Sequence, residues 1–163
     1  MYRVAILAPA PGKLSAMLGD FLSTSHDNPS VSIADGTRLA DFSGEYDLFV
    51  VLSSEIDISS VPPDLSCRVL LLPGSGEPAV FSQIPSKWAV SFGLSGKDSI
   101  TVSSLAPDFA VLSLQRELVA LDGQVIEQQE IPLLMPHATS APGLMALYGS
   151  LLLLGVAPER IAV

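Results

Sequence analysis

The sequence predicts a single α/β domain spanning residues 1–163, with three layers, a mostly parallel sheet, and an antiparallel section in the second half. Apolar side chains make up 48% of the chain, enough for one core of this size. Short strands joined by turns follow Ser99, and an apolar helix follows them. Continuous apolar runs bounded by Pro, Gly or polar residues are typical of buried parallel strands, and the first half has four: Tyr2–Ala8, Leu48–Leu52, Arg68–Leu72 and Trp88–Phe92.

Between these runs, helical spacing of apolar residues predicts a helix over Gly12–Leu22. A short strand is expected at Val31–Ala34 and a short helix at Val80–Ile84. In the second half we expect consecutive strands, with a hairpin turn at Asp122-Gly123. These strands are Ser99–Leu105, Phe109–Leu114, Glu117–Leu121 and Gln124–Leu134.

The final helix is expected over Pro142–Leu154, with Ser140 as its N-cap and Gly155 closing it in the left-handed region. It is apolar on nearly all sides, so it must be buried within the domain or covered by a partner. The apolar run at Leu151–Leu154 therefore motivates the prediction of a homodimer or another protein partner.

Composition excludes several classes of protein. The net charge is −9 and no run of Lys or Arg exists, which argues against nucleic-acid binding. The longest apolar stretch, residues 144–157, is shorter than the ~20 residues of a membrane span, and no signal-peptide pattern is present. We therefore expect a cytoplasmic protein that does not bind a membrane. The single cysteine, Cys67, excludes an internal disulfide and is expected to be a buried thiol.

The stretch Arg3–Leu18 reads as a strand, a turn rich in Pro and Gly, and a helix opening at Gly12-Lys13. In an α/β fold of the Rossmann-like or P-loop-like kind, an anion binds at this position. Gly12, Lys13 and Ser15 are the candidate anion-binding residues. The motif is incomplete, because Leu7 replaces the first Gly and Leu14 replaces the magnesium-binding hydroxyl.

Three passages together resemble the central ATP-binding domain of the Mur ligase family, which adds amino acids to cell-wall precursors, and its folylpolyglutamate synthase relatives. VAILAPAPGKLSAML resembles the strand, phosphate loop and helix of that family. WAVSFGLSGKDSITVSSL, from Trp88 to Leu105, is similar to its strand, Phe-Gly turn and following strand. EIPLLMPHATSAPGLMALYGSLLLLGVAPERI, from Glu130 to Ile161, resembles the strand, Pro-Gly-x-His-Asn turn and Ala-rich helix.

Departures from the family pattern decide what the resemblance implies. His137 lies near the family's histidine, but Ala138 follows it where Asn is expected. The resemblance therefore implies a contracted scaffold without the ligase site. We assign no cofactor, with ATP as the alternative, and Gly12, Lys13, Ser15 and His137 are the candidate residues for binding an anion or a nucleotide. No catalytic residue and no metal ligand is assigned, and the lost motifs argue against an enzyme.

Several interpretations stay open. The protein is a non-catalytic scaffold or interaction protein, or a nucleotide or anion sensor that uses the loop at Gly12-Lys13. A ligase that acts with a second subunit would need its partner to supply the phosphate loop. Ser53 to Asp57 either face the Lys13 loop or form a solvated loop. Glu55, Asp57 and Asp64 are magnesium candidates by position alone.

Overall fold

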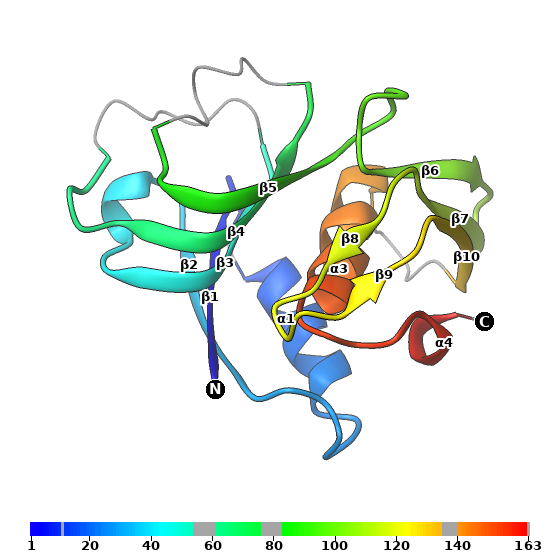
Figure 1. The fold of residues 1–163 in the computed structure, drawn as a ribbon, viewed down its shortest axis with the longest axis horizontal. Coiled ribbons are helices and arrows are strands. Elements are labelled where there is room, and N and C mark those ends of the chain that lie inside the picture. The colour runs from blue at the N-terminus through cyan, green and yellow to red at the C-terminus, as the bar shows by residue number, and fades with distance from the viewer. Residues whose placement is uncertain (11, 54–60, 76–82, 135–139, 163) are drawn as a thin grey trace.

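The computed structural model describes residues 1–10, 12–53, 61–75, 83–134 and 140–162 (Figure 1). The strands are β1 (Tyr2–Leu7), β2 (Val31–Gly36), β3 (Glu45–Val51), β4 (Ser66–Pro73), β5 (Ser86–Phe92), β6 (Ile100–Leu105), β7 (Phe109–Leu114), β8 (Leu118–Val119), β9 (Val125–Ile126) and β10 (Gln129–Leu134). The helices are α1 (Lys13–Leu22), α3 (Ala141–Leu153), α4 (Pro158–Ile161) and the 3-10 helix η1 (Leu39–Asp41). The predicted helix at Val80–Ile84 falls largely outside the described residues.

In the part of the chain that the structure describes, eight strands form one sheet in the order β10-β7-β6-β5-β4-β3-β1-β2. Neighbouring strands from β2 through β6 are parallel, whereas β7 is antiparallel to both β6 and β10. This confirms the predicted mostly parallel α/β fold with an antiparallel part. The four apolar runs of the first half all lie in the parallel section. Both faces of the sheet are covered there, so these strands do not need to alternate apolar with polar residues.

Two details of the second half differ from the prediction. β6 is parallel to β5, pairing Phe92 with Ile100, so the antiparallel part begins only at β7. The single strand predicted over Gln124–Leu134 is two strands that belong to different sheets. β9 pairs with β8 in a separate two-stranded sheet around the Asp122-Gly123 turn, whereas β10 pairs with β7. The polar residues between β9 and β10 let the chain pass from one pairing to the other.

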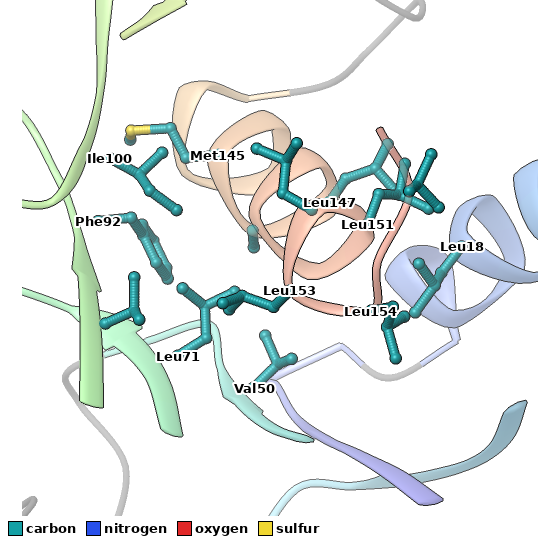
Figure 2. Close-up of a cluster of buried hydrophobic side chains, with 14 of the residues drawn as sticks. Leu18, Val50, Leu71, Phe92, Ile100, Met145, Leu147, Leu151, Leu153 and Leu154 are labelled. Atoms are coloured by element: carbon teal, nitrogen blue, oxygen red, sulfur yellow. The ribbon is translucent and has the colours of Figure 1, made fainter. Parts of the chain in front are cut away.

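Helix α3 lies at the centre of the main core (Figure 1). Ser140 caps it as predicted, since its Oγ accepts a hydrogen bond of 3.2 Å from the backbone N–H of Gly143. Figure 2 shows its side chains facing residues of the neighbouring strands, among them Val50, Leu71, Phe92 and Ile100. The residues of the run Leu151–Leu154 are at most 1% exposed. The chain's own sheet and helix α1 therefore bury the run that motivated the prediction of a partner, and no second chain is needed to cover it.

The two faces of the sheet are covered differently. Helices α1 and α3 pack on one face, α1 through buried Leu14, Leu18 and Leu22. On the other face, in the part of the chain that the structure describes, the cover is η1 and connecting segments around an aromatic cluster, in which the rings of Phe42 and Phe49 are 5.0 Å apart. Cys67 belongs to this second cluster and is buried, as predicted. Within the described ranges, no helix is long and apolar enough to cross a membrane.

Candidate ligand-binding site

The parallel strands of the sheet end together at one edge, which we call the carboxyl edge. There β1 lies between β2, the next strand in the chain, and β3, which returns to its other side. The chain therefore runs from β1 to β2 in one direction and from β3 to β4 in the other. The Leu52 N–H donates to the Leu7 carbonyl at 2.9 Å between the ends of β1 and β3. In open α/β sheets, ligands bind in the crevice outside the strand ends at such a switch point.

Two cavities occupy this position and share Leu52 and Pro142 in their walls. The smaller one, of about 270 Å³, lies between the segment after β1 and the first turns of α1 and α3. The larger one, of about 640 Å³, lies beyond the ends of β3, β4 and β5, against the start of α3. We call the two together the carboxyl-edge cleft. Most of its lining is apolar, as is usual for sites that bind small molecules.

Lys13 is the predicted site residue that the structure brings to the cleft. It lies in the wall of the smaller cavity, at the first position of α1. Gly12 precedes it with φ of +104°, in the left-handed region that a glycine adopts without strain, and no side chain caps the helix there. As the N-cap residue, Gly12 itself supplies no side-chain acceptor to the first turn of α1, which begins at the lysine.

The other predicted site residues do not add to this geometry. The Ser15 hydroxyl donates to the Gly12 carbonyl at 3.0 Å and is not part of the cavity wall. His137 lies outside the described residues, as do Glu55 and Asp57. Asp64 precedes β4 and is therefore at the opposite edge of the sheet, so the prediction that it joins a magnesium site after Leu48–Leu52 is wrong. Ser53, at the end of that strand, does line the larger cavity.

Asp98 is the functional candidate that sequence reasoning missed. It lines the larger cavity although only 4% of it is exposed. Its carboxylate lies against Gly74 and Gly93, which directly follow β4 and β5. The available signal was the pair of glycines that follow two apolar strands. Residues 73–78 do not match the spacing of a phosphate loop. That motif therefore does not indicate that the two glycines make room for a carboxylate.

The opposite edge of the sheet carries charges that pair with one another. Another cavity there, of about 650 Å³, has Arg3, Asp47 and Arg68 in its wall. Asp47 accepts a hydrogen bond of 2.8 Å from the Arg3 backbone and forms an ion pair of 3.4 Å with Arg68. Cys67 lies in the same wall, and burial raises the pKa of its thiol to about 12, so it is not a thiolate nucleophile at neutral pH.

Metal binding receives no support from the described part of the chain, in which no group of three or more His, Cys, Asp or Glu side chains is placed to hold an ion. His26 lies on the loop after α1. The described residues that line the carboxyl-edge cleft include two ionisable side chains, Lys13 and Asp98, one in each cavity.

Neither a comparison with protein-family models nor a search of curated proteins finds a match for this chain.

Proposed function

We propose that this protein is a non-catalytic binding protein whose carboxyl-edge cleft takes a small molecule with an apolar body and an anionic group. The observation that carries this proposal is the pair of adjoining cavities at the switch point of the sheet, with Lys13 in one wall. The proposal joins two expectations from the sequence, a scaffold without ligase chemistry and an anion sensor at Gly12-Lys13. Descent from a Mur-ligase-like domain is part of the proposal.

The smaller cavity is the end that favours an anion. Both α1 and α3 begin at its wall, through Lys13 and through Ser140 and Gly143. The amino end of a helix carries a partial positive charge, so two such ends and a lysine attract negative charge. At the start of α3 the Gly143 N–H already donates to the Ser140 hydroxyl, so the charge of that end acts there through the helix dipole. An anionic group of the ligand would therefore lie at this end, and its apolar body would extend into the larger cavity.

The local structure argues against the ligase reaction of the resembling family. Leu14, at the position of the magnesium-binding hydroxyl, is buried in the core at 4% exposure. Ser15, one residue later, uses its hydroxyl on the Gly12 carbonyl. A phosphate-transfer site needs a metal and a donor set that orient the transferred group. Binding without chemistry is the function that these residues support.

The proposal can be tested with 1-anilinonaphthalene-8-sulfonate, a dye with an apolar body and a sulfonate. We expect wild-type protein to bind it at one site, with an increase in fluorescence. Ala141→Trp places a large ring in the larger cavity and is expected to abolish binding. Lys13→Met removes the charge but keeps the stem, and we expect about three- to tenfold weaker binding, because an exposed charge contributes modestly.

Lys87→Met is the matched control, since Lys87 is exposed at the amino end of β5, on the opposite edge of the sheet. It should bind the dye like wild type. Unchanged dye affinity in a folded Ala141→Trp variant would place the dye elsewhere and refute the proposal. ATP, added with and without magnesium, should displace the dye if the natural anion is a nucleotide. If the dye binds and ATP does not displace it, the anionic group of the natural ligand does not belong to a nucleotide.

A further inference from the structure

The larger cavity contains a carboxylate whose position depends on two glycines. An ideal Cβ on Gly74 would lie 2.8 Å from Cγ of Asp98 and would overlap its Oδ1. A Cβ on Gly93 would lie 3.0 Å from the same Cγ and would overlap Oδ2. Any other residue at the end of β4 or β5 would therefore displace this carboxylate. The backbone of two neighbouring strands leaves room for a negative charge in the wall of an otherwise apolar cavity.

Hydrogen bonds hold the Asp98 loop, and no cation is paired with the charge of Asp98 among the described residues. The N–H of Ser95 donates to Oδ2 at 3.1 Å. The side-chain amide of Gln115 donates to the carbonyls of Ser95 and Asp98 at 3.0 and 2.8 Å, so the loop is fixed from outside the cavity. In the described ranges, no Lys or Arg lies within 4.0 Å of the carboxylate. A buried carboxylate without a countercharge is unfavourable, and a cationic ligand group would relieve that cost.

The surroundings of Asp98 fit the apolar body of such a ligand. Phe92 and Met145 form the buried floor of the same cavity. Leu94 lies in its wall and is 78% exposed, so a large apolar side chain beside the carboxylate has no cover from the described protein. Apolar surface next to one buried charge is the arrangement that recognises an organic cation rather than a hydrated metal ion.

We propose that Asp98 binds the protonated amine of the ligand, so that the ligand of the carboxyl-edge cleft carries an ammonium group next to its apolar body. This inference rests on the proposed function of the cleft and specifies the chemistry at its second end. A protonated amine supplies both a positive charge and several N–H donors to the carboxylate.

Three indoles of similar shape test the proposal: tryptamine, which is cationic, tryptophol, which is neutral, and indole-3-acetate, which is anionic. Calorimetric titration is done in about 0.5 M NaCl, because the net charge of −9 attracts any cation at low salt and this exposed attraction is then screened. We expect wild type to bind tryptamine at least about tenfold more tightly than tryptophol, as for a hydrogen bond to a charged group.

Asp98→Asn should remove this preference, leaving tryptamine and tryptophol with equal affinity. Asn retains an oxygen that can accept the Ser95 N–H, so the loop is expected to keep its shape. Asp108→Asn is the matched control: it removes the same charge from an exposed residue just before β7 and should leave the preference unchanged. A backbone NMR spectrum of wild type should show that tryptamine shifts the amide signals of Ser95 and Asp98, which tests the site even if Asp98→Asn does not fold.

Equal affinity of wild type for tryptamine and tryptophol overturns the inference, and so does a preference that persists in folded Asp98→Asn. If the dye binds and Ala141→Trp abolishes its binding while tryptamine shows no preference, the inference fails and the proposed function stands. If neither the dye nor any of the three indoles binds at millimolar concentration, both fail.

Discussion

Asn28 connects the loop after α1 to the end of that helix, and its replacement by Asp should make stability depend on pH. The residue is 9% exposed. Its Nδ2 donates to the carbonyls of Phe21 and Leu22, each at 3.2 Å, and so caps the carboxyl end of α1. Its Oδ1 is buried, and no donor from the described residues reaches it. An aspartate here would place a carboxylate oxygen against two carbonyl oxygens at the negative end of the helix.

The magnitude follows from these contacts. Asn28→Ala loses two hydrogen bonds, each contributing about 1 kcal/mol, but it also removes the unsatisfied Oδ1, so we expect a net loss of about 1 kcal/mol. Asn28→Asp loses the same bonds and adds the burial of a charge and repulsion by the helix dipole, which raise the pKa of the new carboxyl in the folded state. With a rise of about 2.5 units, its additional cost at pH 7 is about 3 kcal/mol.

The sign of the pH effect is set by proton binding. In the folded Asn28→Asp variant the new carboxyl binds its proton more tightly than in the unfolded chain. The stability of this variant therefore falls as pH rises above about 4, by about 1.4 kcal/mol per unit, until the folded pKa is passed. Urea denaturation of wild type, Asn28→Ala and Asn28→Asp between pH 4 and about pH 8 measures this. Free energies of unfolding that run in parallel for the two variants over that range would refute the argument.

Close packing and burial elsewhere in the fold lead to three more expected outcomes. Gly74→Ala should destabilise the fold by about 2 kcal/mol or more, because the new Cβ overlaps the Asp98 carboxylate. Adding Asp98→Ala should recover most of that loss. Additive effects of the two changes in a double-mutant cycle would contradict the close approach of Gly74 and Asp98. Because burial raises the pKa of Cys67 to about 12, native protein at pH 8 should react with a disulfide reagent at least about 100-fold more slowly than unfolded protein, and comparable rates would show the thiol to be accessible. Leu71→Ala, in the middle of the sheet with no exposed surface, should lower the free energy of unfolding by about 3 kcal/mol in urea, and a loss below about 1 kcal/mol would mean that α3 does not pack there.

The carboxyl-edge cleft shows how far sequence reasoning reached into the site. The position of Lys13 at the start of α1 was predictable, because a glycine and a lysine after a buried strand mark a helix start. The position of Asp98 was not, because it depends on Gly74, which precedes it by 24 positions and adjoins it through the pairing of β4 with β5. The exposure of Leu94 is likewise a product of tertiary packing.

Local pattern in the chain was enough to specify the four apolar strands of the first half and the final helix. Short apolar runs bounded by turn residues favour buried strands, whereas the longer apolar run between Ser140 and Gly155 favours a helix, and these signals are all local. The point at which the strand over Gln124–Leu134 divides depends instead on tertiary contacts, because pairing with β8 and with β7 compete for neighbouring residues. The cover of Leu151–Leu154 depends on them too: an apolar helix looks the same in sequence whether its own sheet or a partner buries it, and here the sheet does so.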